Sequence, residues 1–440
     1  MEWRLALISE HASPLALVGG VDAGGQNIAV AELATHLAKL GYKIDVFTRW
    51  DDPSQPETVD WKQNVRIVHV QAGPKTFVPK EELLCYMDEF TENVIRFMNH
   101  QSDPYKLIHA HFFMSGLVAA NIKRALNIPF AVTFHALGEV RKQVQGSCDH
   151  FPPERFNVEQ RVICEADALV ALCPQDRDDL ISLYGADAAK IFTIPNGFNP
   201  EEFYPIDKPL ARIVLGLDPT EPVILQLGRI VPRKGVDNVV RALGHLRRTY
   251  GMVARLLIVG GESDLPDPDL TPEIGRLQQL AEEEGVTQWV TFTGRRQRET
   301  LRYYYSAADV FVTTPWYEPF GITPLEAMAC GTPVVGSAVG GIKQTIQDGE
   351  TGFLIPPNDP PALAAKLAAL LYSKKLRNVM SEASIQHVQE NYTWLEVAHQ
   401  TANLYELIMS GQLSPAKMQR RTVLPASNQL NASIIAASKN

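Results

Sequence analysis

Two carboxylates stand eight residues apart in the second half of the chain, with a glycine between them. Glu318 opens this segment, Glu326 closes it, and Gly321 lies in the middle. The pattern predicts a turn that opens a helix, and free backbone N–H groups at a helix start suit a diphosphate. Carboxylates accept hydrogen bonds from hydroxyl groups. The pair favours a ligand with phosphates and hydroxyls, although either glutamate alone is more often a solvated surface residue.

A loop with two cations five residues apart follows an apolar run in the same half. The loop contains Gly228, Arg229 and Lys234. Two such cations can neutralise a diphosphate leaving group without a metal ion. Exposed arginines and lysines form similar clusters without any function, so the loop counts only together with the carboxylates.

The first half offers glycines and histidines at the ends of expected strands. Gly24–Gln26 lets the backbone approach a ligand, but it lacks the full G-x-G-x-x-G spacing, so a plain tight turn is an equal alternative. His135 follows another strand, where a lone histidine is usually structural. His109 and His111 form an i, i+2 pair without a third ligand, so the sequence does not indicate a metal site.

Short apolar runs, which we expect to be strands, alternate with helical patterns along the chain. These strands and helices must position the candidate residues. A helix is expected from about Gln26 to Leu40, ending at Gly41. The alternation predicts an α/β fold of two Rossmann-like domains facing each other across a central cleft, beside the carboxyl ends of their strands. Strands are expected at residues 4–9, 43–49, 66–70, 107–109, 130–134, 168–172 and 191–194, and then at 223–227, 254–259, 290–293, 310–313, 333–336 and 352–355.

The length of 440 residues exceeds what one core usually supports, which favours two domains. A polar, proline-containing stretch at 199–218 marks the boundary. We expect two Rossmann-like domains, then a helical segment that could cross back to the first domain, and a mobile tail. The expected bounds are 1–205, 206–384, 385–410 and 411–440.

Composition excludes several classes of function. The net charge of −9 argues against nucleic-acid binding. Five cysteines without a C-x-x-C motif indicate neither a disulfide framework nor a zinc site. The N-terminus has no cationic leader, and no apolar run reaches about 18 residues, so we expect neither secretion nor a membrane span. These features are typical of a cytoplasmic protein.

Residues 3–408 resemble the retaining GT-B glycosyltransferases of family 4, whose E-x7-E pattern stands here as Glu318 and Glu326. The resemblance implies that the N-terminal domain binds the acceptor and the C-terminal domain binds the nucleotide-sugar. By that resemblance Glu318 binds hydroxyls of the donor sugar and Glu326 holds the ribose of the nucleotide. The implied catalytic residues are His135, Arg229, Lys234 and Glu318. The implied donor-binding residues are Gly25, Gly228, Arg229, Lys234, Arg295, Glu318, Phe320, Gly321, Ile322, Thr323 and Glu326.

The segment 77–84 resembles the P-K-E-x-L element of sucrose-phosphate synthases, and similar segments occur in inositol-phosphate glycosyltransferases. Both families use a phosphorylated acceptor. The resemblance implies that Lys80 and Arg155 bind its phosphate, with Arg141 as a weaker third. Three solvated loop cations are the alternative. The implied acceptor-binding residues are Gly24, Gly25, Gln26, Lys80, Arg141 and Arg155.

Resemblance to sucrose-phosphate synthases implies transfer of glucose from a nucleotide-glucose, with UDP-glucose favoured, to fructose 6-phosphate. The chain differs from the plant enzymes at 72–74 and 135–141, and we expect no appended phosphatase domain. The family needs no metal or other cofactor, and the leaving diphosphate is thought to accept the acceptor proton. The alternatives are transfer to inositol phosphate or another sugar phosphate, and a catalytically silent nucleotide-sugar sensor. The sensor is disfavoured because the implied functional residues are all present, namely Arg229, Lys234, Glu318 and Glu326.

Overall fold

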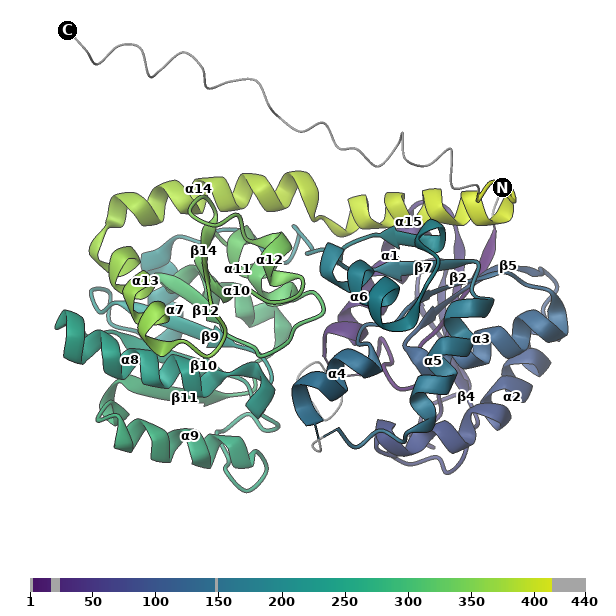
Figure 1. The fold of residues 1–440 in the computed structure, drawn as a ribbon, viewed down its shortest axis with the longest axis horizontal. Helices are drawn as coiled ribbons and strands as arrows, with labels where there is room; N and C mark the ends of the chain where they lie inside the picture. The colour runs from purple at the N-terminus through teal and green to yellow at the C-terminus, as the bar shows by residue number, and fades with distance from the viewer. Residues whose placement is uncertain (1–2, 17–23, 147–148, 414–440) are drawn as a thin grey trace, which may run out of the picture.

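The computed structural model describes residues 3–16, 24–146 and 149–413. It contains two α/β lobes side by side, each with a sheet covered by helices (Figure 1). This is the predicted GT-B architecture. Within the described ranges, no helix combines the length and apolar character that a membrane span needs.

The first sheet has eight strands in the order β3-β4-β2-β1-β5-β6-β7-β8. Its strands pair in parallel except β3 with β4, which is antiparallel. The inner strands are continuous buried runs, as a parallel sheet covered on both faces requires. The strands are β1 (Arg4–Ile8), β2 (Lys43–Arg49), β3 (Thr58–Lys62), β4 (Val65–Val70), β5 (Tyr105–His111), β6 (Phe130–Thr133), β7 (Ala168–Ala171) and β8 (Ile191–Thr193).

The second sheet has six strands, all parallel, in the order β11-β10-β9-β12-β13-β14. Every expected strand is present in one of the two sheets, with ends that differ by up to two residues. Only β3 was not predicted. The strands are β9 (Val223–Leu227), β10 (Arg255–Val259), β11 (Val290–Gly294), β12 (Val310–Thr313), β13 (Val334–Ser337) and β14 (Gly352–Ile355).

Helices cover both faces of each sheet (Figure 1). The first lobe contains α1 (Gly25–Lys39), α2 (Met87–Asn99), α3 (Phe113–Leu126), α4 (Gly138–Gln145), α5 (Glu154–Glu165) and α6 (Pro174–Tyr184). The second lobe contains α7 (Lys208–Leu215), α8 (Val236–Tyr250), α9 (Pro272–Glu283), α10 (Arg298–Ala307), α11 (Ile322–Ala329), α12 (Ile342–Thr345) and α13 (Pro360–Tyr372). Two long helices follow, α14 (Lys374–Asn391) and α15 (Trp394–Met409).

The chain passes between the lobes twice, and the two passes are hydrogen-bonded to each other. The Phe198 N–H donates to the Tyr392 carbonyl at 2.8 Å, and the Trp394 N–H donates to the Phe198 carbonyl at 3.1 Å. A Cβ at Gly197 would lie 2.8 Å from the Trp394 nitrogen, so the close approach requires glycine. We call this feature the paired crossing.

The C-terminal helices run along one side of the molecule (Figure 1). Helix α14 packs on α11 of the second lobe, and α15 packs on α1 of the first. The helical pattern begins at Lys374, earlier than the expected Ile385. The helical pattern is interrupted between α14 and α15. A new helix starts there, because Thr393 caps α15 by accepting a hydrogen bond from the Glu396 N–H. The expected tail lies, from residue 414, outside the described residues.

Candidate active site

The Gly24–Gln26 turn of the first lobe reaches the donor loops of the second. A Cβ added at Gly24 would lie 3.8 Å from Nε of Arg229, and one at Gly25 would lie 3.9 Å from Cδ1 of Ile322. The Gln26 amide donates to the Ser9 hydroxyl and the His111 carbonyl, both at 3.2 Å. The structure therefore brings the expected glycine turn of one lobe onto two expected donor residues of the other.

The segment from Glu318 to the start of α11 is the predicted turn before a helix. Gly321 has φ +90°, a conformation that favours glycine. The Glu318 carbonyl accepts from the Gly341 N–H at 3.2 Å, and a Cβ at Gly340 would overlap that carbonyl oxygen at 1.9 Å. Phe320 is buried, so this segment offers a ligand mainly backbone N–H groups and the Glu318 side chain.

The cationic loop is held against the end of β12. Gly235 has φ +63°, and a Cβ there would lie 2.0 Å from the Thr314 carbonyl oxygen. The Trp316 N–H donates to the Arg233 carbonyl at 2.9 Å. The loop thereby presents Lys234 to Glu318, and their side chains form an ion pair.

The side chains around Glu318 carry more positive than negative charge. Burial would raise the pKa of Glu318, but the charges of Lys234 and Arg233 hold it below its usual value, so this carboxylate is ionised. Burial and the neighbouring Arg229 lower the pKa of Arg233 to about 10, so it remains protonated at neutral pH. Three cations thus surround one carboxylate. Sequence reasoning missed Arg233, although it stands in the same loop.

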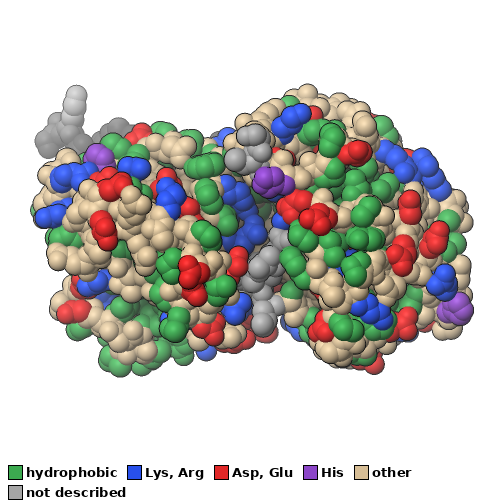
Figure 2. All heavy atoms as spheres, turned by 90° about the horizontal axis from the view of Figure 1, so that it is seen from below, with side chains coloured by type: hydrophobic (Ala, Val, Ile, Leu, Met, Phe, Trp, Pro, Cys, Tyr) green, Lys and Arg blue, Asp and Glu red, His purple; other side chains and the backbone are tan. Residues whose placement is uncertain are grey.

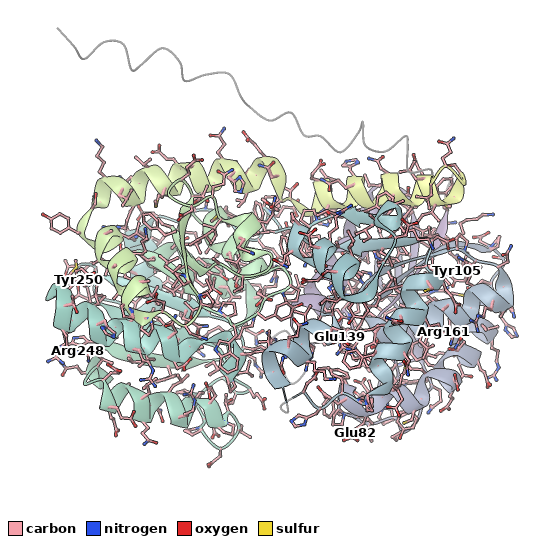
Figure 3. The ribbon with its side chains drawn as sticks, viewed as in Figure 1. Glu82, Tyr105, Glu139, Arg161, Arg248 and Tyr250 are labelled. Carbon is pink, nitrogen blue, oxygen red and sulfur yellow. The ribbon has the colours of Figure 1, made fainter. Side chains whose placement is uncertain are left out.

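Lysine and arginine side chains are visible deep in the hollow between the two lobes (Figure 2). Helix α4 of the first lobe borders this space (Figure 1), and Glu139 of this helix is labelled in Figure 3. Arg141, two residues further along, contributes to lowering the pKa of Arg233. The second lobe therefore supplies the excess positive charge, while Arg141 of the first lobe lies near it and is paired with Asp149.

Glu326 lies on α11 and is only 2% exposed. One of its oxygens accepts from Nη1 of Arg298 at 2.9 Å, and the other accepts from the Tyr305 hydroxyl at 2.9 Å. Sequence reasoning did not single out either donor. Arg295 and Gly228, also expected near the donor, lie at the ends of β11 and β9, and Arg295 is 3.5 Å from Asp264. Thr323 is half-buried in the first turn of α11.

His135 lies two residues after the end of β6 with φ +58°, a strained conformation for a residue other than glycine. Its Nε2 is 3.0 Å from Nδ1 of His111, and burial lowers the pKa of His135 to about 3. His109 lies between the Thr133 hydroxyl and the Tyr405 hydroxyl of α15. His135 is therefore neutral at physiological pH and can hydrogen-bond a hydroxyl group.

The cations expected to bind acceptor phosphate already have carboxylate partners. Nζ of Lys80 lies 2.9 Å from Glu81, and Nη2 of Arg141 lies 3.0 Å from Asp149. Both side chains keep some exposure, 20% for Lys80 and 16% for Arg141. An acceptor phosphate at these cations would compete with the carboxylates.

Arg155 differs from the expectation. Its side chain is 1% exposed, and its Nε donates to the fully buried Glu159 at 2.8 Å. The guanidinium stacks on Phe112, Phe113 and Phe151 at 4.5–5.1 Å from the ring centroids. This geometry does not support phosphate binding by Arg155, because the charge is paired and enclosed within the core.

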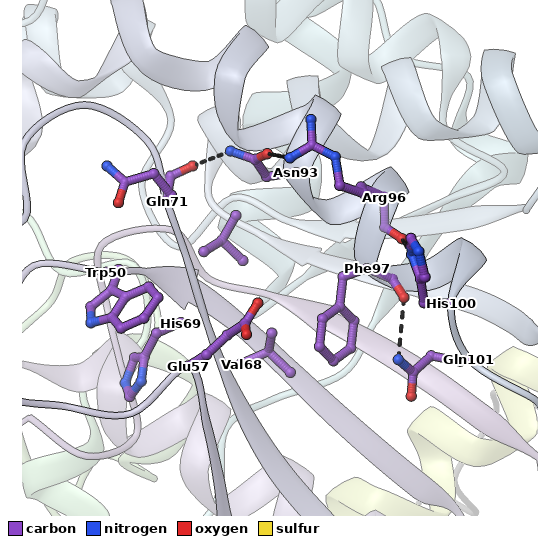
Figure 4. A pocket seen from close by; sticks show the side chains of 11 residues that line it. Trp50, Glu57, Val68, His69, Gln71, Asn93, Arg96, Phe97, His100 and Gln101 are labelled. Atoms are coloured by element: carbon purple, nitrogen blue, oxygen red, sulfur yellow. Dashed lines mark hydrogen bonds between the residues drawn. The ribbon is translucent and has the colours of Figure 1, made fainter.

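A separate cavity of about 390 Å³ lies between β4 and α2 (Figure 4). Trp50, His69, Asn93 and Arg96 are among its lining residues, and the Asn93 amide donates to the Gln71 carbonyl at 2.7 Å. None of the expected site residues lines this cavity. The expected residues that the structure brings together, the Gly24–Gln26 turn with Arg229, Lys234 and Glu318, lie where the two lobes meet.

Two facing Rossmann-like lobes, with a cationic loop and two glutamates at the meeting edge, define the class of a GT-B glycosyltransferase. Family models support this class, since residues 207–387 match Glycosyl transferases group 1 and residues 23–202 match Glycosyltransferase Family 4. The chain belongs to these GT-B glycosyltransferases.

Individual relatives cover nearly the whole chain. The D-inositol 3-phosphate glycosyltransferase 2 of Catenulispora acidiphila is 35% identical, with 91% of this chain and 94% of that protein covered. The solved sucrose-phosphate synthase of Thermosynechococcus elongatus is also 35% identical, with a TM-score of 0.85 and coverage of 93% and 100%. Anabaena HepE, solved with UDP and glucose, shares the fold at a TM-score of 0.71 and 18% identity over 92% of this chain and 100% of that one.

Proposed function

We propose that this glycosyltransferase moves glucose from UDP-glucose to fructose 6-phosphate, giving sucrose 6-phosphate and free nucleotide. The observation that carries the proposal is the convergence of Arg229, Arg233 and Lys234 with Glu318 in the interlobe hollow. A site with excess positive charge suits two anionic substrates, a nucleotide diphosphate and a sugar phosphate. The likeness to the Thermosynechococcus sucrose-phosphate synthase supports this choice of acceptor.

In the proposed mechanism Glu318 accepts hydrogen bonds from donor sugar hydroxyls, and Glu326 accepts them from the ribose. Backbone N–H groups at the start of α11 meet the diphosphate. Arg229 and Lys234 stabilise the charge that grows on the diphosphate as the glycosidic bond breaks, and donors held in place act most strongly there. His135 remains neutral and bonds the donor sugar.

The acceptor hydroxyl attacks the face from which the diphosphate departs, so the configuration at the sugar carbon is retained. The oxygen of the leaving diphosphate takes the proton from this hydroxyl. No side-chain base and no metal ion enters the scheme, since the cations of the loop carry out the neutralisation.

A second acceptor, inositol phosphate, is favoured by the names of the relatives in Catenulispora acidiphila and Corynebacterium urealyticum, at 35% and 36% identity. The deciding experiment measures product formation with UDP-, ADP- and GDP-glucose against fructose 6-phosphate, inositol phosphate and fructose. Sucrose 6-phosphate as the main product supports the proposal. Preference for inositol phosphate moves the chain to the second candidate, and no product from any pair refutes both and favours a silent sensor.

A further inference from the structure

Arg298, the first residue of α10, joins two carboxylates that are far apart in the sequence, Glu202 of the segment between the lobes and Glu326 of α11. Its Nε donates to Oε2 of Glu202 at 2.7 Å, and its Nη1 donates to Oε1 of Glu326 at 2.9 Å. The guanidinium stacks on the buried ring of Phe203 at 4.8 Å. One planar cation therefore orients two carboxylates through separate edges, a geometry that lysine cannot reproduce.

The second oxygen of Glu326 accepts from the Tyr305 hydroxyl. Burial raises the pKa of Tyr305 well above its usual value, so this hydroxyl stays protonated and keeps donating. Arg298 and Tyr305 are seven residues apart on one face of α10, so a single helix fixes both oxygens. An ionised carboxylate has about four acceptor sites, so Glu326 can still accept from ligand hydroxyls in a set direction.

Glu202 places the other end of this network close to the paired crossing. It follows Phe198 by four residues, and its N–H donates to the Asn199 carbonyl at 3.1 Å. Burial raises the pKa of Glu32 of α1, in the first lobe, and the nearby charges of Glu202 and Arg298 raise and lower it, respectively, so this carboxyl also lies near the network. The network thus extends from the expected ribose carboxylate to the segment that joins the lobes.

We propose that Arg298 is a positioning residue that holds Glu326 in the orientation for ribose and ties the ribose site to the interlobe segment through Glu202. This inference rests on the proposed function, in which Glu326 binds the ribose of a nucleotide-sugar. Without Arg298 the Glu326 carboxylate keeps only the Tyr305 bond and turns away from the ribose hydroxyls. A protein without Arg298 should therefore bind the ribose hydroxyls more weakly but keep its contacts to the diphosphate.

The test compares binding of UDP, ADP and GDP with binding of their 2′,3′-dideoxy analogues to the full chain by calorimetry. The wild type should prefer the ribonucleotide by at least about tenfold, as two hydrogen bonds to a charged acceptor allow. Arg298→Met should reduce this preference to about twofold. Glu202→Gln should have a smaller effect, because the Nη1 bond to Glu326 remains.

Arg302→Met is the matched control. Arg302 lies one turn further along α10 and its Nη1 donates to the Tyr204 hydroxyl at 2.9 Å, also near the crossing. This variant should keep the wild-type preference. An Arg298→Met protein that binds the ribonucleotide with undiminished preference overturns the inference, and equal losses in both variants overturn it as well.

Arg298→Lys covers the case in which Arg298→Met does not fold. It keeps the positive charge but cannot bridge both carboxylates, so its ribose preference should fall at least threefold, and full retention would overturn the inference. A wild type that binds none of the three nucleotides would refute the proposed function itself. The two outcomes can be distinguished, because an incorrect role for Arg298 would leave nucleotide binding by the wild type intact.

Discussion

The expected binding cations of the two lobes differ in how many carboxylates are paired with them. In the second lobe, Arg229, Arg233 and Lys234 surround the single carboxylate Glu318. In the first lobe, each expected acceptor cation has its own carboxylate, as in the Lys80–Glu81 pair. The donor side is therefore charged before any ligand binds, whereas the acceptor side is close to neutral.

Under the proposed function, this difference predicts how the two substrates are held. A diphosphate would enter a site whose positive charge is preorganised, which favours tight binding and charge stabilisation in the transition state. An acceptor phosphate must exchange places with Glu81 or Asp149, so its net gain is smaller. Acceptor selectivity should accordingly be easier to change than donor binding.

The largest expected effect concerns Arg155, whose buried guanidinium in the first lobe is ion-paired with Glu159. Arg155→Ala should lower the free energy of unfolding by about 3–5 kcal/mol, because Glu159 is left as a buried charge without its partner. Chemical denaturation of the variant measures this loss. Adding Glu159→Gln should recover part of it, since the unpaired charge is then removed.

Arg161→Ala is the control on the same helix, labelled in Figure 3. Its ion pair with Glu165 is partly exposed, at 31% and 22%, so the variant should lose no more than about 1 kcal/mol. A small stability loss for Arg155→Ala, together with a specific loss of activity on phosphorylated acceptors, would restore the acceptor role expected from the sequence.

The next effect is on turnover at the donor side. Arg229→Ala and Lys234→Ala should each reduce kcat by about 10²–10³-fold, because each removes a charge needed most in the transition state. Steady-state kinetics on the full chain measures the loss. Arg248→Ala on α8, whose partner is Glu284, should leave turnover unchanged. Turnover within twofold of wild type for both donor variants would exclude these cations from the mechanism.

A smaller effect is expected at the acceptor cations. The wild type should prefer fructose 6-phosphate to fructose by at least about tenfold, and Lys80→Ala and Arg141→Ala should shrink this preference without changing donor affinity. Kinetics with both acceptors measures it. Equal use of the two acceptors by the wild type would mean that these pairs stabilise the first lobe and do not bind phosphate.

The smallest expected effect is that of a chelator. In the proposed mechanism, cations of the protein neutralise the leaving diphosphate, so excess EDTA should leave the rate nearly unchanged. The measurement is an activity assay before and after chelation, followed by addition of magnesium or manganese. Complete loss with recovery on metal addition would show that the donor cations are not sufficient.

Sequence reasoning located nearly all strands, because buried parallel strands read as short continuous apolar runs. It missed β3, whose Thr58–Lys62 mixes polar and apolar residues at an antiparallel edge. Most of the expected donor residues could be singled out because they lie close together in the sequence, in two short segments. Arg298 and Tyr305 could not be found this way, because only the packing of α10 on α11 brings them to Glu326.

Arg155 shows a different limit of sequence reasoning. A basic residue early in a polar helix resembles a surface cation, and its burial depends on aromatic side chains that lie elsewhere in the chain, such as Phe112. The one local signal was Glu159, four residues later on the same helix face. A charged i, i+4 pair does not reveal whether it is exposed or enclosed.

The paired crossing makes the second lobe an insertion within the chain of the first. The chain leaves the first lobe near Phe198 and returns at Trp394, and the two passes are bonded neighbours. Helix α15 then completes the first lobe by packing on α1. Domain insertions are tolerated where the two junctions lie close together. The second lobe could therefore be replaced by that of a related protein, with one junction near Phe198 and the other near Trp394. Such chimeras would combine a new nucleotide-sugar specificity with the unaltered acceptor half.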